Sequence, residues 1–160
     1  MPVIIALVTL ALQSAPVAAP VTASEPHAFI LTGAGRFAVL ADLTTRRREG
    51  EIAEMRSLQV SEDAFKIGDV EYWGGWSRWR FDCAATTADR LDFASLRADG
   101  VEGPSTPEPS PAYPASPGGD AAELLAIACS TEDRAPDAKT LEDAIILGRA
   151  ALSGDLDPPR

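Results

Sequence analysis

The sequence has 160 residues, of which 46% are hydrophobic and 24% are charged, a balance typical of one globular domain rather than of a disordered chain. Its formal net charge of −10 argues against a nucleic-acid-binding protein, because such proteins need a basic face to displace counterions from phosphates. An anionic membrane surface is disfavoured for the same reason.

The N-terminus has the pattern of a secretory signal peptide over residues 1–23. Residues 3–12 form an apolar run that ends well short of the roughly 20 residues that a membrane-spanning helix requires, which favours a cleaved signal over a membrane anchor. Small residues before two possible cut points place cleavage after Ala19 or Ala23. We therefore expect an exported protein, periplasmic or on the cell surface, with no integral membrane span in the mature chain.

Two expected β-strands open the mature chain. Residues 36–42 are rich in β-forming side chains, and a turn at Glu49-Gly50 leads to a return strand over residues 52–60. The hydrophobic positions change parity along this return strand, which indicates a β-bulge or a strand covered on both faces. Three glycines in residues 61–75 predict irregular backbone there.

The clearest strand pattern of the chain lies in residues 76–83. Apolar and charged side chains alternate there, so that one face carries Trp79, Phe81 and Cys83 and the other carries Arg78, Arg80 and Asp82. This alternation is typical of a half-buried antiparallel strand. We expect a further strand over residues 89–96, with Leu91 and Phe93 in phase.

Two helices are expected in the C-terminal third. Six of the thirteen prolines fall within residues 102–117, so we expect an extended loop that does not pair in a sheet. Ser116 is then placed as the N-cap of a helix that continues through residues 121–129, with a buried stripe at Leu124, Leu125 and Ala128.

The second helix is expected over residues 137–152, at the end of a linker and amphipathic helix that occupy residues 131–160. Thr140 and Asp143 resemble a capping box. Hydrophobic or small residues recur at helical spacing along one face, namely Leu141, Ile145, Gly148 and Leu152. The sequence thus predicts an α+β domain, an antiparallel sheet of four or more strands followed by two C-terminal helices.

A disulfide between Cys83 and Cys129 completes this expected fold. The two residues are the only cysteines, and an even pair in an exported chain indicates a bridge. It would close a loop of 46 residues and restrict the unfolded state by roughly 4 kcal/mol. Two separate buried thiols are the alternative, and the export signal disfavours it.

The order of these features resembles the surface-adhesin E family of bacterial exported proteins. The resembling pieces are residues 37–50, Arg80-Phe-Asp-Cys83 followed by Arg90-Leu91, residues 98–100, and residues 114–119 leading into Ala128-Cys129. The resemblance spans a domain at residues 24–130 and implies a curved antiparallel sheet whose helix is tied by the disulfide. It also implies adhesion to host matrix proteins. No binding residue of the family can be carried over to this chain.

Two groups of residues are candidates for contact with a partner. Tyr72, Trp73 and Trp76 surround a glycine pair, and such aromatics are binding anchors when exposed, although they more often fold back into a core. The run Arg46-Arg47-Arg48 lies at an expected turn. It is either an anchor for an acidic partner or lipid head group, or a solvated hairpin tip, which we favour.

The sequence predicts no metal site, no cofactor and no catalytic constellation. His27 is the only histidine, lies near the mature N-terminus in an expected flexible setting, and has no nucleophile motif around it. We therefore expect a non-catalytic envelope or surface protein that binds a protein partner in the manner of an adhesin. The alternative is a periplasmic enzyme of unknown class whose carboxylate site the sequence does not reveal.

Overall fold

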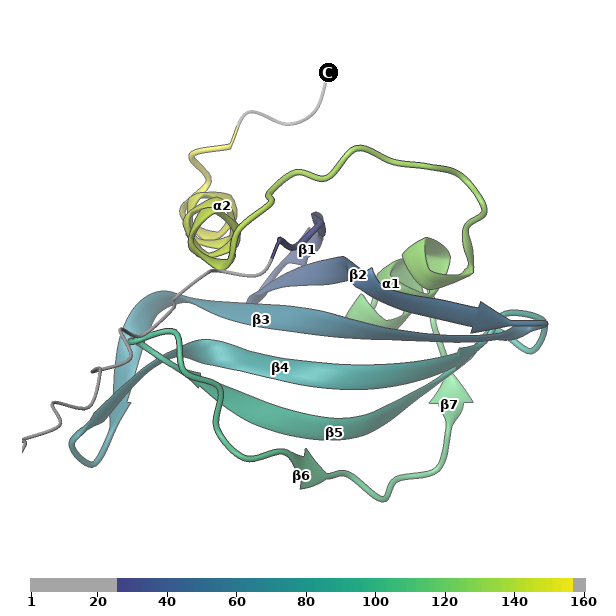
Figure 1. The fold of residues 1–160 in the computed structure, drawn as a ribbon, viewed down its shortest axis with the longest axis horizontal. Helices are drawn as coiled ribbons and strands as arrows, with labels where there is room; N and C mark the ends of the chain where they lie inside the picture. The colour runs from purple at the N-terminus through teal and green to yellow at the C-terminus, as the bar shows by residue number, and fades with distance from the viewer. Residues whose placement is uncertain (1–25, 157–160) are drawn as a thin grey trace, which may run out of the picture.

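One antiparallel sheet organises the protein, for which a computed structural model describes residues 26–156 (Figure 1). The expected signal peptide and both of its expected cleavage points lie outside the described residues. Five long strands pair in chain order: β1 (Phe29–Ala34), β2 (Ala38–Glu49), β3 (Ile52–Ile67), β4 (Val70–Asp82) and β5 (Thr87–Arg97). Two helices follow, α1 (Asp120–Cys129) and α2 (Leu141–Ser153). The predicted α+β architecture is confirmed.

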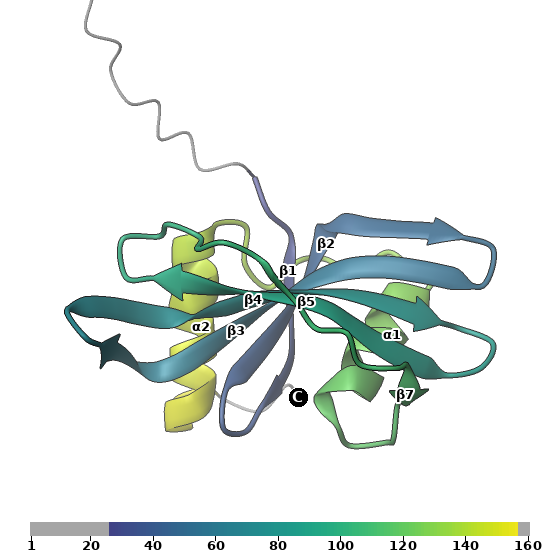
Figure 2. The ribbon, with the colours of Figure 1, turned by 90° about the horizontal axis from the view of Figure 1, so that it is seen from below.

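The two helices cover opposite faces of this sheet. Successive strand residues point to opposite faces, and along β2 Leu40 belongs to the hydrophobic cluster under α2, whereas Val39 and Ala41 belong to the cluster under α1. Figure 2 shows that the helices also lie at opposite ends of the twisted sheet. Strand β3 is therefore covered on both faces, which explains its parity change. Its pairing with β4 is regular over residues 52–60, and the register shift against β2 lies between Asp42 and Arg47, so the extra residues belong to β2 and β3 has no bulge there.

Helix α2 docks on the sheet through its predicted face. Thr140 caps the helix by accepting a hydrogen bond from the Asp143 backbone N–H, which confirms the capping motif although the helix starts four residues later than expected. Gly148 is buried so closely against β2 and β3 that an added Cβ would lie 3.1 Å from Val60 Cβ and 3.2 Å from Ala38 Cβ. The absence of a side chain at this position lets the helix approach the sheet.

Helix α1 is joined covalently to the end of β4. The Cys83–Cys129 disulfide is present, with the two Cα atoms 5.7 Å apart, as the sequence predicts. Leu124 and Ala128 are buried against the sheet, and Leu125 packs partly against it. The predicted N-cap is wrong, since the cap residue is Gly119. Ser116 lies in the turn before the helix, where its backbone carbonyl accepts a hydrogen bond from the Gly119 N–H.

The expected irregular backbone at residues 61–75 is present only as register shifts within a hairpin, between Val60 and Phe65 in β3 and between Tyr72 and Gly74 in β4. Strands β3 and β4 run on past the sheet and are joined by a tight turn in which Gly68 has φ +61°, a conformation that glycine adopts without steric cost. We call residues 62–72 the β3–β4 arm. The arm projects at the lower left of Figure 1. The glycines that the sequence pattern assigns to a loop thus belong to a long hairpin.

The proline-rich connection pairs with the sheet, contrary to expectation. Strands β6 (Thr106–Pro107) and β7 (Tyr113–Pro114) both pair with the edge strand β5. Proline lacks an N–H, but non-proline neighbours supply the donors, as when the Glu108 N–H donates to the Leu91 carbonyl. The segment thereby covers parts of an edge that would otherwise be open to further pairing.

In the last long strand, β5, the buried side chains differ from Leu91 and Phe93, which the sequence pattern places in phase. Its fully buried side chains are Ala88, Ala94 and Leu96, while Leu91 and Phe93 are half-buried. A register shift opposite Arg78 and Trp79 changes the parity of the strand midway. The Phe93 ring lies over Gly75, where an added Cβ would come within 2.4 Å of it.

Candidate functional site

The three predicted aromatic residues occupy different environments. Trp76 is only 4% exposed and belongs to the core under α2, so it is not available as an exposed binding anchor, which corrects that part of the prediction. Trp73 packs partly against the same core. Tyr72 lies on the arm, half-buried, with its ring stacked on Phe65 at a centroid distance of 5.7 Å.

The three predicted arginines lie on strand β2 rather than at a hairpin tip, and strand alternation separates them. Arg46 Nη1 donates to the carbonyls of Ile127 and Ser130, and Arg48 Nη1 donates to the carbonyl of Cys129. These carbonyls end helix α1, whose last turn has no basic residue of its own, so cations from β2 satisfy its C-terminus. Arg47 is exposed and pairs across the ladder with Glu54.

Large apolar side chains are exposed mainly at the end of the molecule where the arm projects. Of the six exposed large hydrophobic residues in the described range 26–156, four lie there, with exposed fractions of 40% for Phe65, 65% for Ile67, 50% for Val101 and 60% for Ile146. Figures 1 and 2 agree in placing the arm and α2 at one end. We call these four residues the arm-end surface. Exposed apolar residues gathered in this way mark interaction sites more often than scattered ones do.

A groove of about 680 Å³ lies within this end of the molecule. It is lined by residues of α2 and its N-cap, by the base of the arm and by the turn after β5: Trp73, Asp99, Thr140, Leu141, Glu142, Ile145, Ile146 and Arg149. Its lining is mainly apolar, with acidic groups toward the start of α2 and one arginine farther along the helix. The groove therefore suits an apolar side chain flanked by charge rather than a polar metabolite.

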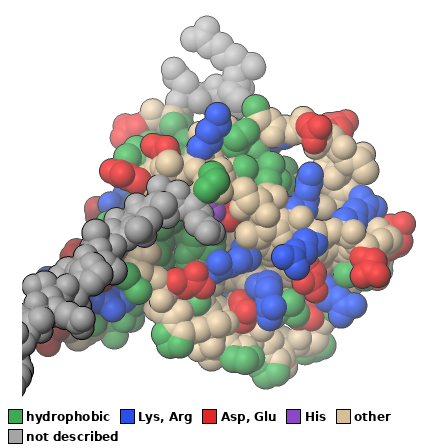
Figure 3. Space-filling model, viewed as in Figure 1, with side chains coloured by type: hydrophobic (Ala, Val, Ile, Leu, Met, Phe, Trp, Pro, Cys, Tyr) green, Lys and Arg blue, Asp and Glu red, His purple; other side chains and the backbone are tan. Residues whose placement is uncertain are grey.

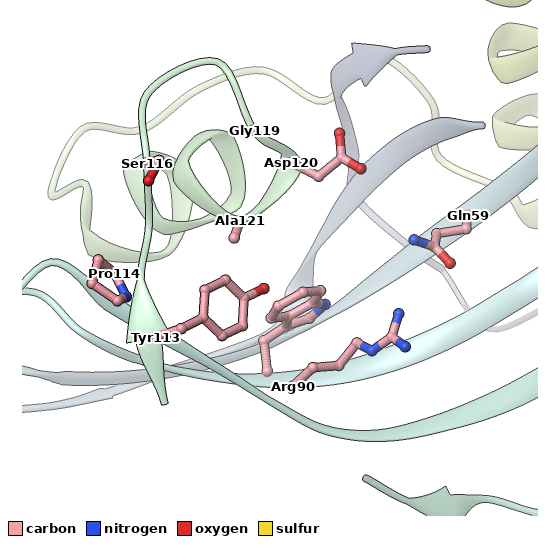
Figure 4. A pocket seen from close by; sticks show the side chains of 9 residues that line it. Gln59, Arg90, Tyr113, Pro114, Ser116, Gly119, Asp120 and Ala121 are labelled. Atoms are coloured by element: carbon pink, nitrogen blue, oxygen red, sulfur yellow. The ribbon is translucent and has the colours of Figure 1, made fainter. Parts of the chain in front are cut away.

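A second hollow, of about 410 Å³, lies beside the start of α1 (Figure 4). Tyr113 and Trp79 form its aromatic walls, and Gln59, Arg90 and Asp120 contribute polar groups. Burial raises the pKa of the Tyr113 phenol above its usual value. Arg90 is already held by Glu108, to which its Nε donates at 2.6 Å. The hollow offers hydrogen bonds and ring faces to a ligand.

A histidine–aspartate pair is the feature that sequence reasoning missed. His27 Nδ1 lies 2.8 Å from Asp42 Oδ2, and the His27 ring stacks on Phe29, so this histidine is held in place rather than flexible. Asp42 is fully buried and its other oxygen accepts hydrogen bonds from Thr44. The signal was an aspartate ending an apolar strand, since a buried carboxylate requires partners.

Acidic side chains on the α2 face meet arginines in rows across the sheet. One row of paired residues runs Asp42, Arg56, Arg78, Asp92, and the next runs Arg47, Glu54, Arg80, Asp89. Figure 3 shows blue and red side chains intermixed on this side of the molecule. Within residues 26–156, no group of three or more His, Cys, Asp or Glu residues is placed to hold a metal ion.

No protein-family model, curated protein or solved structure matches this chain. The resemblance to the surface-adhesin E family is accordingly a prediction from the quoted residues alone. In the part of the chain that the structure describes, no helix combines the length and the apolar character needed to cross a bilayer.

Proposed function

We propose that the protein is a non-catalytic exported protein that binds a protein partner through its arm-end surface. The observation that carries the proposal is the gathering of Phe65, Ile67, Val101 and Ile146 at one end of the molecule, beside a projecting hairpin. Apolar side chains held on a regular hairpin lose little conformational freedom on binding, which favours association. This mode of action agrees with the adhesion that the family resemblance implies.

Export is supported by the oxidised Cys83–Cys129 pair. Disulfides form and persist in the periplasm and outside the cell, whereas the cytosol keeps most thiols reduced. The apolar N-terminal segment of the sequence supports the same compartment.

The alternative function is a periplasmic enzyme with a carboxylate-based site. A pair of catalytic carboxylates needs two acids that face a shared substrate position. On the charged sheet face, the acids Glu54, Asp89 and Asp92 each stand opposite an arginine. In this arrangement each carboxylate is neutralised by an arginine, and the acids do not converge on a shared substrate position. The geometry therefore favours binding over catalysis.

The test is capture of partners from the native envelope with an altered arm. A Phe65→Ser/Ile67→Ser double variant removes the exposed apolar side chains of the arm and leaves the core unchanged, because neither residue is buried. A Leu156→Ser variant is the matched control, since it removes an exposed apolar side chain after helix α2, outside the arm-end surface. We expect the arm variant to lose the partner that the wild-type protein and the control both retain.

Recovery of the same partner with all three proteins would contradict the proposal. Circular dichroism and thermal unfolding of the variants establish that the fold is intact. Hydrolytic turnover of envelope glycans or peptides by the purified wild-type protein would favour the enzyme instead.

A further inference from the structure

The exposed stripe of helix α2 is complementary to itself. Glu142, Ile146 and Arg149 are spaced four and three residues apart, so they share one face of the helix. Ile146 is 60% exposed in the middle of this stripe, with an acid toward the start of the helix and a base toward its end. All three residues line the groove at the arm end.

Neither charge of this stripe, Glu142 or Arg149, has an ion-pair partner within residues 26–156. Arg149 Nε and Nη2 are buried and have no hydrogen-bond acceptor within that range. Buried hydrogen-bond donors without acceptors are costly, so a carboxylate from a partner that bound the Arg149 guanidinium would stabilise it.

We propose that a second copy of this chain occupies the groove, with the two α2 helices packed antiparallel about a two-fold axis. In such a pair Glu142 of each copy lies opposite Arg149 of the other, because a two-fold interface matches residue i with j and j with i. The midpoint of this match falls between Ile145 and Ile146. Ile146 of each copy then inserts beside the axis into the apolar groove of its partner.

The charges of the groove agree with this orientation. Asp99, whose carboxylate pairs with Arg97 at 3.0 Å, lines the groove together with Glu142 near the start of α2. Glu142 is therefore the acid of this end that would receive the partner's Arg149. A parallel arrangement would instead place acid against acid and base against base, which is unfavourable. The antiparallel pair is therefore the orientation that the charges select.

The expected association is reversible. A helix of 13 residues is about 20 Å long, and one helix face with its flanking groove is smaller than the roughly 800 Å² that each partner contributes to a standard interface. We expect a dimer whose population rises with protein concentration. The dimer does not depend on the proposed function. It would cover Ile146 of the arm-end surface and leave Phe65 and Ile67 of the arm for a partner, and the two arms of each dimer would add avidity.

Sedimentation velocity and equilibrium of the purified mature protein test the proposal without any partner. We expect Ile146→Glu to abolish the dimer, because it buries a carboxylate at the axis. Glu142→Arg and Arg149→Glu should each raise the dissociation constant about tenfold or more, since each places like charges opposite one another twice per dimer. Glu132→Arg, a charge reversal at an exposed position of the link between the helices, is the matched control and should leave dimerisation unchanged.

The decisive measurement mixes the two single charge variants. Copies of Glu142→Arg and Arg149→Glu should associate with one another as tightly as wild type, because every contact across the axis again joins opposite charges. A wild-type protein that is monomeric at all concentrations would overturn the proposal. A dimer that is insensitive to Ile146→Glu, or variants that do not recover on mixing, would overturn the assigned interface. Thermal unfolding of each variant separates these outcomes from misfolding.

Discussion

Single residues decide how closely the helices approach the sheet. Gly148 has Val60 and Ala38 directly beneath it, and Arg46 and Arg48 reach the C-terminus of α1 from strand β2. The run of three arginines shows how position within a strand determines role: two of them satisfy helix carbonyls, while Arg47 between them points to the other face. Residue type alone does not distinguish these roles.

Replacement of Gly148 by leucine should destabilise the protein. The larger side chain has no room between α2 and the strands below it, and overpacking of this kind costs about 1 to 3 kcal/mol of unfolding free energy. Gly35→Ala is the control, because an added Cβ there meets no atom within 4 Å. Urea unfolding of both variants measures the difference. Equal midpoints for Gly148→Leu and wild type would show that α2 does not dock as described.

At the scale of elements, the two helices are held by different means. Helix α1 is tied to β4 by the disulfide and capped by arginines, whereas α2 is held by its buried face and its Thr140 cap. The tether before α1 is proline-rich and pairs with the sheet over the short strands β6 and β7 and through isolated backbone contacts such as the Leu96–Glu102 bridge. Loss of the disulfide therefore concerns α1 far more than α2.

Reduction of Cys83–Cys129 should lower stability and loosen α1 selectively. Opening a loop of 46 residues removes roughly 4 kcal/mol by the chain-entropy estimate. Thermal unfolding with and without reductant measures the total effect, and amide hydrogen exchange shows which helix opens. We expect faster exchange in residues 120–129 and little change in α2, which serves as the internal control. An unchanged midpoint with fully reduced thiols would argue against this account.

At the scale of the whole molecule, the two ends differ in chemistry. One end holds the disulfide and the capped end of α1, and the other carries the arm, the groove and most of the exposed apolar residues. The helices cover opposite faces at these two ends, which leaves part of each sheet face open (Figure 2). This division places the cross-link away from the surface that we assign to binding.

Cleavage of the link between the helices should release α2 but not α1. Residues 131–136 lie outside helices and strands and are mostly exposed, so a specific protease site placed there leaves the sheet intact. After cleavage, α2 is held only by noncovalent contacts, namely its packing on the sheet and the backbone hydrogen bonds that join residues 137–139 to His27 and Phe29. It should therefore dissociate at denaturant concentrations that leave the uncut protein folded. Gel filtration under non-reducing conditions detects the released peptide. Retention of α2 until the sheet itself unfolds would contradict this prediction.

Local patterns predicted much of the fold. The alternation at Trp79 and Phe81 depends only on the strand period, and the Thr140 cap depends on residues three positions apart, so both were correct from the sequence. Of the candidate site, the sequence named Tyr72, Trp73 and Trp76 as one group. The structure puts Tyr72 on the arm and Trp73 at its base, whereas Trp76 is buried in the core. Its burial depends on contacts with His27 and Phe29, which are distant in sequence.

The amino-acid sequence by itself determined the class of the domain, the half-buried strand before Cys83, the pairing of the two cysteines and the face on which α2 is apolar. These features follow from short-range periodicity or, for the disulfide, from the presence of only two cysteines in the sequence. Only the tertiary structure decided that the glycines of residues 61–75 belong to a hairpin, that prolines pair along β5, and that Glu142, Ile146 and Arg149 stand beside a groove. The physical reason is that these outcomes depend on which distant backbone groups and side chains come into contact, and composition along the chain does not encode that directly.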